Sequence, residues 1–251
     1  MRVAVFLLAL IGFNSSAAAA DELKVYAAAG VKAPFQKLAA DYEAATGHRI
    51  AVVFDTAGAT NKSFLSDPGA AILITTQALI SEGEKSGRLK NGGSYRLGAT
   101  VAGLAAPPGS PKPDISTTEK LRAVLLSARR IAFSDPARGA TVGTHFMKMI
   151  ESMGIKDEVL KKATLAQDGI ETMRLVLEEQ VDLGVTQTSE IVQANRAALV
   201  GPFPKEFDLA TTYSLWHHAN LSVATSGFVT LLTGPSGRAA LAEEGLRPPD
   251  Q

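Results

Sequence analysis

The sequence predicts an α/β fold, in which helices alternate with the strands of mainly parallel sheets. Three apolar runs near the start, residues 23–28, 50–54 and 70–74, are predicted to be buried strands. Between the first two runs, residues 35–45 place apolar side chains on one face of a helix. This strand–helix–strand alternation is typical of parallel sheets with helices packed on their faces. Residues 55–61, small and polar, are predicted to be a loop.

A second unit of the same kind follows the segment richest in proline and glycine, residues 107–111. Residues 97–106 form a predicted strand that leads into this segment, and residues 130–133 and 183–187 form predicted strands beyond it. A segment of this composition indicates a boundary, so the chain is predicted to hold two α/β units. The remaining predicted helices lie at residues 77–86, 118–127, 142–153, 158–164, 169–179, 189–194, 228–232 and 238–243.

Composition and charge exclude several classes of function. The 251 residues hold 25 Lys and Arg against 25 Asp and Glu, and no basic tract suited to a nucleic-acid backbone is present. The chain has no cysteine, which excludes disulfides and Cys-ligated zinc. His217 and His218 are adjacent on a predicted extended segment and point to opposite faces, which makes them a poor metal pair. We therefore expect no nucleic-acid partner, no metal and no cofactor.

The N-terminus has the pattern of a secretory signal peptide. A basic start at Arg2 is followed by an apolar run over residues 3–13, which is too short to span a bilayer. Ala18 and Ala20 then form a small-residue cleavage site ahead of a polar pair. We expect residues 1–20 to be a signal peptide that is cleaved near Ala20, and the mature protein to be periplasmic.

Five segments, spread over nearly the whole mature chain, carry a resemblance to a known family. They are VYAAAG at residues 25–30, TAGAT at 56–60, AFSDP at 132–136, DLGV at 182–185 and LTGPSGR at 232–238. Their order and spacing resemble those of the molybdate-binding-like periplasmic solute-binding proteins, which have the type 2 periplasmic binding protein fold.

The resemblance implies two lobes, each a mixed, mainly parallel sheet flanked by helices, joined by two crossing segments. The crossings are expected near residues 98–108 and 210–222, which gives a first lobe of residues 21–100 plus 222–251 and a second lobe of residues 101–221. The ligand is expected between the lobes, at strand ends and helix N-termini, where free N–H groups favour a small anion. The resemblance also implies a monomer that hands this ligand to the membrane permease of an ABC-type transporter.

The positions that match the family's ligand-binding side chains differ in this sequence. In the molybdate binders, hydroxyl and tyrosine side chains hold the oxyanion, and the matching positions here are Gly30, Ala57 and Gln187. We therefore expect an organic acid with several carboxylates in place of molybdate, because an Arg side chain binds a carboxylate through two parallel hydrogen bonds. The residues expected to bind it lie in the loops and helix starts between the lobes: Gly30, Val31, Thr56, Ala57, Asn61, Lys62, Arg138, Thr141, Gln187 and Thr188.

Some candidate side chains also have an ordinary structural interpretation. Arg138 on a turn is often exposed to solvent, and Lys62 on a first helical turn more often faces solvent than ligand. His145 shares a predicted helix face with Met149 and is as readily a structural histidine. Asp55 follows a strand, where a turn or capping role is common.

Two functions stay open at this point. The first is a binding module that captures a solute without altering it. The second is an enzyme on the same scaffold, since a periplasmic isomerase of aconitate resembles this family. In that case Asp55 or His145 is the candidate base that removes an allylic proton, while Arg138 and Lys62 hold the carboxylates.

Overall fold

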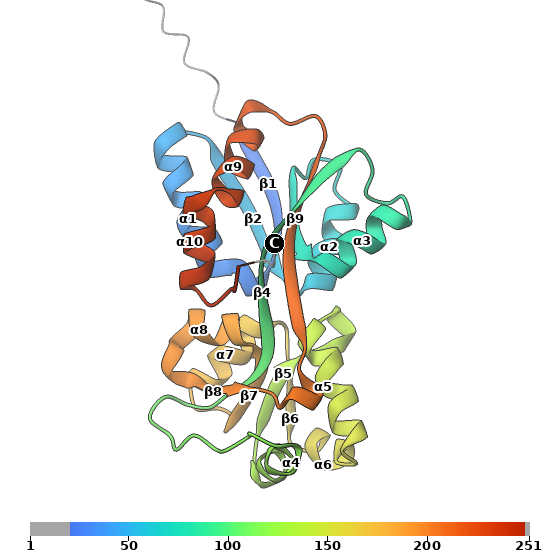
Figure 1. Ribbon diagram of the computed structural model, residues 1–251, viewed down its shortest axis with the longest axis vertical. Coiled ribbons are helices and arrows are strands. Elements are labelled where there is room, and N and C mark those ends of the chain that lie inside the picture. The colour runs from blue at the N-terminus through green and yellow to red at the C-terminus, as the bar shows by residue number, and fades with distance from the viewer. Residues whose placement is uncertain (1–20, 249–251) are drawn as a thin grey trace, which may run out of the picture.

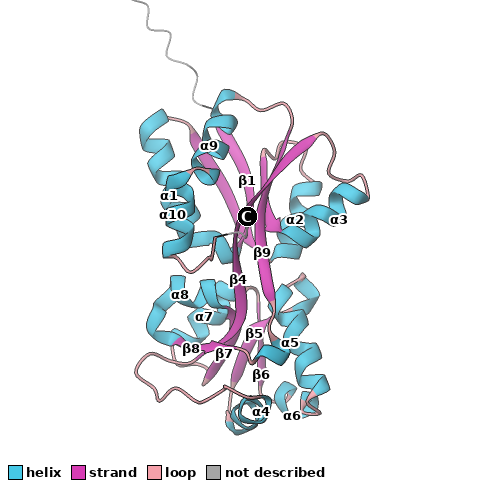
Figure 2. Ribbon diagram, viewed as in Figure 1, coloured by secondary structure: helices cyan, strands magenta, loops and turns pink. Residues whose placement is uncertain are grey.

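The computed structural model describes residues 21–248, which form a mixed nine-stranded sheet running through two lobes, with helices on both sides of the strands in each lobe (Figures 1 and 2). The strands are β1 (Glu22–Ala28), β2 (Arg49–Asp55), β3 (Ile72–Thr76), β4 (Gly92–Ala105), β5 (Ile131–Ser134), β6 (Ala163–Ala166), β7 (Leu183–Gln187), β8 (Leu199–Pro202) and β9 (Ala210–His218). The helices are α1 (Lys32–Thr46), α2 (Ala57–Leu65), α3 (Gln77–Lys85), α4 (Thr118–Ser127), α5 (Thr141–Ser152), α6 (Lys156–Leu160), α7 (Gly169–Leu177), α8 (Thr188–Asn195), α9 (Val223–Thr233) and α10 (Pro235–Glu243). A short 3₁₀ turn, η1 (Ala29–Val31), leads into α1.

The long strand β4 belongs to both lobes. Its residues 92–101 pair antiparallel with β9, and its residues 102–105 pair antiparallel with β7. In the first lobe, β1 lies between β2 and β3 and runs parallel to both. In the second lobe, β5 lies between β6 and β7 and also runs parallel to both. Parallel strands covered by helices on both faces are apolar throughout, which explains the continuous apolar runs that predicted them.

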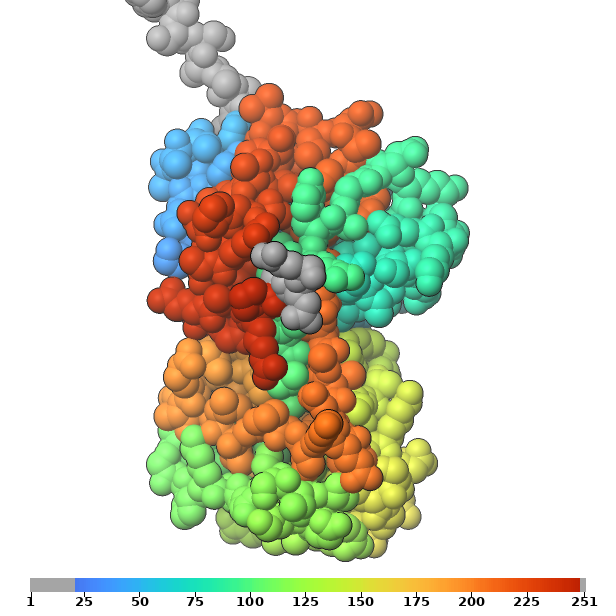
Figure 3. All heavy atoms as spheres, viewed as in Figure 1, coloured from blue at the N-terminus to red at the C-terminus, as the bar shows by residue number. Residues whose placement is uncertain are grey.

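Each lobe has its own hydrophobic core. In the first lobe the buried apolar side chains come from residues 23–97 and 213–246, and Phe35 packs edge-on against Phe228 at 5.4 Å between ring centroids. In the second lobe they come from residues 102–203, where Phe133 packs against Phe146 at 4.9 Å. The predicted two-lobed α/β architecture is confirmed. The space-filling view shows that the molecule is narrower where the two lobes meet (Figure 3).

The strand β9 runs beside β4 from the second lobe into the first (Figure 1). Its residues 213–217 pair with β3, and residues 210–218 pair with the first part of β4. Leu209, immediately before β9, packs against the core of the second lobe. The chain therefore returns from the second lobe to the first along β9, whose partners no local pattern specifies.

Three local predictions also differ from the structure. The predicted loop over residues 55–61 contains the start of α2, whose N-cap Thr56 accepts a hydrogen bond from the N–H of Ala59 at 3.2 Å. Residues 163–164, expected to end a helix, begin the edge strand β6, and β8 was not predicted. Small residues after a capping threonine suit a loop or a helix equally, and short edge strands carry little apolar pattern.

The export prediction concerns residues 1–20, which lie outside the described residues. Among residues 21–248, no helix combines the length and the apolar character needed to cross a bilayer.

The packing of Phe146 predicts how much stability the protein loses when a large side chain is removed from the core of the second lobe. Its side chain is fully buried between Phe133 and Phe203, so Phe146→Ala should lower the free energy of unfolding by about 3–5 kcal/mol. Urea unfolding followed by circular dichroism measures this loss. Val223→Ala is the control, because Val223 is 89% exposed and its truncation should change stability by no more than about 0.5 kcal/mol. Equal effects of the two substitutions would contradict the described core.

Candidate functional site

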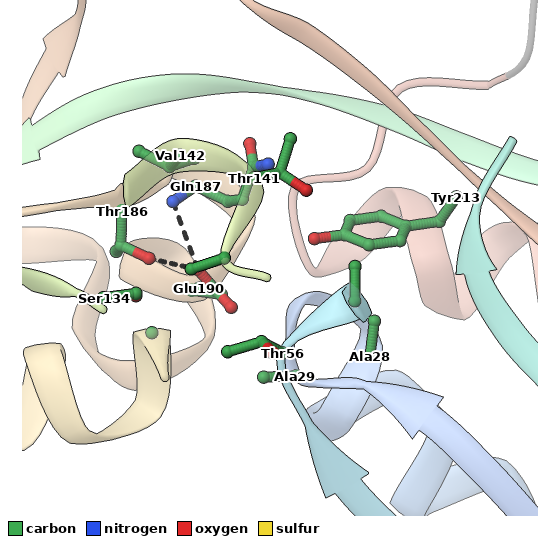
Figure 4. A pocket seen from close by; sticks show the side chains of 13 residues that line it. Ala28, Ala29, Thr56, Ser134, Thr141, Val142, Thr186, Gln187, Glu190 and Tyr213 are labelled. Atoms are coloured by element: carbon green, nitrogen blue, oxygen red, sulfur yellow. Dashed lines mark hydrogen bonds between the residues drawn. The ribbon is translucent and has the colours of Figure 1, made fainter. Parts of the chain in front are cut away.

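A small cavity lies between the lobes, where the carboxyl ends of several strands lead into helices. Its volume is about 30 Å³, enough for about two water molecules. Figure 4 shows side chains from the two lobes facing each other across it. The lining residues are Ala28, Ala29, Thr56, Ala57 and Tyr213 from the first lobe, and Ser134, Ala140, Thr141, Val142, Gly169, Thr186, Gln187 and Glu190 from the second.

Helix N-termini dominate this lining. Ala57, Thr141 and Gly169 are the first residues of α2, α5 and α7, and Gln187 is the N-cap of α8. The first N–H groups of a helix have no partner within the helix and form the positive end of its dipole. No Lys or Arg is among the described lining residues. The positively polarised groups that face the cavity are therefore backbone N–H groups at the helix starts.

The N-terminus of α5 is open to a ligand. Two of the other helices carry a side-chain cap, from Thr56 on α2 and from Asp168 on α7. In α8, the Glu190 side chain accepts a hydrogen bond from the backbone N–H of the N-cap residue Gln187. The N-cap of α5 is Ala140, whose side chain offers no acceptor, and the first turn of α5 holds no acidic residue. An uncapped helix start that lines a cavity is a ready-made anion site.

Glu190, at the third position of α8, brings a carboxylate into the same cavity. It is buried, and it accepts hydrogen bonds from the Thr186 hydroxyl and from the backbone N–H of Gln187 at 3.1 Å. Burial raises the pKa of Glu190 to about 7; the two hydrogen bonds oppose this change, and the nearby charge of Asp168 adds to it. Glu190 therefore exchanges a proton near neutral pH.

Tyr213 of β9 lies across the cavity from Glu190 (Figure 4). Its ring occupies the space beside Gly30, where an added Cβ would lie 2.3 Å from the tyrosine oxygen. Burial, followed by the charge of Glu190, raises the pKa of Tyr213 well above its usual value, so its hydroxyl stays a hydrogen-bond donor. Gln187 donates from Nε2 to Thr211 at 2.9 Å, and its buried Oε1 has no partner within residues 21–248.

Part of the predicted site lines the cavity. Thr56, Ala57, Thr141 and Gln187 are among the lining residues, as the sequence predicted. Gly30 and Val31 are buried directly behind Ala29 in η1 and do not line the cavity. The Gly30 carbonyl instead accepts hydrogen bonds from α8, from the Ser189 hydroxyl at 3.2 Å and from Gln193 Nε2 at 2.8 Å.

Four other predicted binding residues lie away from the cavity. Lys62 in α2 is exposed and is not among the residues that line the cavity. Asn61 is buried, and its Oδ1 has no hydrogen-bond partner within the described chain. The Thr188 hydroxyl lies 3.0 Å from that of Thr100 in β4. These three contribute no atom to the cavity lining, and neither does Arg138.

Arg138 and Asp55 form an ion pair that joins the lobes. Nη2 of Arg138 donates to both carboxylate oxygens of Asp55, at 2.9 and 2.8 Å. The expected anion clamp and the expected base thus neutralise each other outside the cavity. His145, the other candidate base, lies 2.8 Å from the carbonyl oxygen of Phe207 and does not line the cavity either. Its contacts fit the structural alternative.

Backbone contacts beside this ion pair hold the cleft closed. The N–H of Gly58 donates to the carbonyl of Gly139 at 3.1 Å, and the Thr56 hydroxyl donates to the carbonyl of Arg138. A Cβ on Gly58 would lie only 2.7 Å from the Cα of Gly139. Two glycines that meet across the cleft therefore permit the lobes to approach this closely.

Sequence reasoning missed four polar residues of the lining. Ser134 and Thr186 lie at the carboxyl ends of predicted strands, so the rule that ligands bind at strand ends would have found them. Glu190 stands three residues after Gln187, which is the spacing of a capping box. Tyr213 carries no local signal, because only the pairing of β9 brings it to the cavity.

A family model for bacterial extracellular solute-binding proteins matches residues 23–247. The chain belongs to this family. An interface between two lobes is a common place for a small-molecule site. No group of three or more His, Asp or Glu residues in the described part of this solute-binding protein is arranged to hold a metal ion.

Solved structures and one relative support the predicted resemblance. The periplasmic molybdate-binding protein of Azotobacter vinelandii has a TM-score of 0.73 at 17% identity, over 91% of this chain and 100% of that one. A phosphate-bound structure from Clostridium perfringens, named for a phosphate ABC transporter substrate-binding protein, has a TM-score of 0.68 at 12% identity, over 92% and 100%. An aconitate isomerase of a Pseudomonas species is 24% identical over 236 residues, 90% of this chain and 87% of that one. The structural likenesses show the shared fold and confirm the predicted molybdate-binding-like fold family.

Because Gly58 and Gly139 meet across the cleft, a larger residue at position 58 should hinder closure of the two lobes. Gly58→Ala keeps a helical residue in α2 but adds a methyl group against Gly139, which costs the closed form about 1–3 kcal/mol of steric strain. Small-angle X-ray scattering should show a larger radius of gyration at an unchanged melting temperature. Gly201→Ala is the control, because the nearest atom to its added Cβ lies 4.0 Å away. Identical scattering from the two variants would show that this contact does not limit closure.

Proposed function

We propose that this protein is a periplasmic solute-binding protein that closes around a small anion and delivers it to the membrane permease of an ABC-type transporter. The observation that carries the proposal is the uncapped N-terminus of α5, which lines an interlobe cavity without a lining cation. Backbone N–H groups bind an anion without a permanent positive charge, and closure removes the water that competes for them.

The size and chemistry of the cavity limit the ligand. In the closed form the cavity holds about 30 Å³ and offers hydroxyl groups from Ser134, Thr141, Thr186 and Tyr213. This space suits a compact oxyanion or one carboxylate group of an organic acid. An acid with several carboxylates, which the sequence favoured, requires a more open arrangement of the lobes, because Arg138 is engaged by Asp55.

The relatives support this assignment. The family consists of bacterial extracellular solute-binding proteins. Two proteins with the same fold are named for molybdate binding and for a phosphate ABC transporter. The signal-peptide pattern of residues 1–20 fits export to the periplasm, where such proteins meet their permease.

A new charge inside the cavity tests the proposal. Thermal unfolding is measured with phosphate, sulfate, molybdate, acetate, succinate and citrate, and at least one of them should raise the melting temperature. An anion present at 100 times its Kd should add about 2.7 kcal/mol to the free energy of unfolding. Ala57→Asp should abolish this response because its carboxylate occupies the anion's space. The fold should survive, since an acidic residue at the first position of α2 favours the helix.

Ser63→Asp adds the same charge on the exposed face of α2 and should keep the response. An unresponsive wild-type protein, or an Ala57→Asp variant that responds normally, would reject anion binding at this cavity.

A second function, isomerisation of aconitate, is supported by Glu190. A carboxyl group that titrates near pH 7 beside a ligand space is a suitable general base, and a relative 24% identical in sequence is an aconitate isomerase. In this case Glu190, not Asp55 or His145, removes the allylic proton and returns it at the other end of the allyl system, while the helix N-termini stabilise the developing negative charge.

Proton NMR of cis- and trans-aconitate incubated with the protein tests this second function. Interconversion that Glu190→Gln abolishes, and that Asp55→Asn retains, would establish an isomerase with Glu190 as its base. No interconversion at high protein concentration would eliminate it.

A further inference from the structure

Glu190 is the one acidic side chain among the described residues that line the cavity. It also lines a neighbouring groove of about 430 Å³, formed by α1, α7 and α8, so its carboxylate stands in the wall between the two spaces. A permanent negative charge at this position would repel an anion in the cavity. Its hydrogen bond from the Gln187 N–H accounts for Glu190 at the start of α8, but simple anion binding does not account for a carboxylate in the wall of the cavity.

One carboxylate oxygen of Glu190 accepts hydrogen bonds from the protein, and the other accepts none of these bonds. Oε2 accepts both hydrogen bonds, from the Thr186 hydroxyl and from the Gln187 N–H, and Oε1 receives neither. Gly169 at the start of α7 provides the room, since a Cβ there would lie 2.1 Å from Oε2 and 2.4 Å from Oε1. Oε1 is therefore the oxygen able to contact a ligand.

The ionisable groups on two neighbouring elements favour a protonated Glu190. Asp168, the N-cap of α7, is an acidic neighbour whose charge raises the pKa of Glu190. Tyr213 of β9 is neutral, because burial and the charge of Glu190 raise its own pKa. Neither group supplies a positive charge that would hold Glu190 ionised when an anion enters.

The two cationic side chains that line the groove with Glu190 contact other residues. Arg174 of α7 forms ion pairs with Glu171 and Glu178. The Lys32 ammonium of α1 lies 5.9 Å from the centre of the Phe54 ring. Within residues 21–248, Glu190 forms no ion pair shorter than 4.0 Å with Lys, Arg or His, so a proton is the available means of neutralising it.

We propose that the anion binds together with one proton, which is held between Oε1 of Glu190 and an oxygen atom of the ligand. The proposal rests on the anion-binding function above and adds the chemistry of recognition. A proton in this position replaces repulsion between two negative charges with a charge-assisted hydrogen bond. Glu190 supplies it to a fully ionised anion such as sulfate or succinate, and an anion that keeps an acidic proton, such as hydrogen phosphate, brings its own.

The proposal fixes how affinity depends on pH. Above about pH 7 the empty site holds Glu190 ionised, so a fully ionised anion must bind with proton uptake and its affinity falls as pH rises. Below this pH the proton is already present and the affinity levels off. Hydrogen phosphate carries its own proton, so its binding above pH 7 requires no proton uptake and its affinity does not fall in this way. The site therefore favours hydrogen phosphate over fully ionised anions in alkaline solution.

Isothermal titration calorimetry with sulfate, succinate and phosphate tests this coupling in the wild-type protein. Each anion is titrated at pH 6 and pH 8, in two buffers of different ionisation enthalpy, so that the heat reports the number of protons taken up. For sulfate and succinate, we expect uptake of about one proton at pH 8, little uptake at pH 6, and an affinity that falls about tenfold per pH unit above 7. For phosphate, we expect little uptake at pH 8.

A matched pair of variants identifies the group responsible. Glu190→Gln should remove the proton uptake and the pH dependence for sulfate and succinate, and should remove the preference for phosphate at pH 8. Glu178→Gln makes the same chemical change on the groove side of α7 and should leave both intact.

The outcomes separate the two proposals. Binding of sulfate or succinate without proton uptake at pH 8, and with a flat pH profile, would overturn proton sharing and leave anion binding intact. Uptake that persists in Glu190→Gln would also overturn it. If none of the three anions binds at either pH, anion recognition and proton sharing both fail.

Discussion

The antiparallel pairing of β4 with β9 is the constraint on which the site depends. β4 pairs with β9 in the first lobe and with β7 in the second, so one strand sets where the two sheets stand relative to each other. The parallel strands β1 and β5 then end facing the gap between the lobes, and each leads into a segment at which helices begin. The meeting of α2, α5 and α7 at one cavity follows from strand direction, as ligand sites do in other α/β folds.

The charges near this gap are arranged differently from a site built on side-chain cations. The Arg138 guanidinium pairs with Asp55 across the cleft and so joins the lobes, and no Lys or Arg is among the described residues that line the cavity. The meeting of Gly58 and Gly139 allows the lobes to approach closely. Thr56 takes part in both arrangements, because it lines the cavity and its hydroxyl donates to the Arg138 carbonyl across the cleft.

The buried carboxylate of Glu190 connects binding with acid–base chemistry. A group that exchanges a proton near neutral pH beside an anion can select the protonation state of a ligand, or can move a proton on it.

The sequence by itself determined the α/β class and the division into two units, and it singled out four of the residues that line the cavity, namely Thr56, Ala57, Thr141 and Gln187. These follow from local periodicity and from the rule that parallel strands deliver their loops to one edge. Only the tertiary structure decided that Tyr213 enters the cavity and that Asp55 and Arg138 neutralise each other outside it. Both depend on contacts between residues far apart in the chain. The burial of Glu190 likewise exists only in the folded protein, where residues of both lobes surround the cavity that it lines.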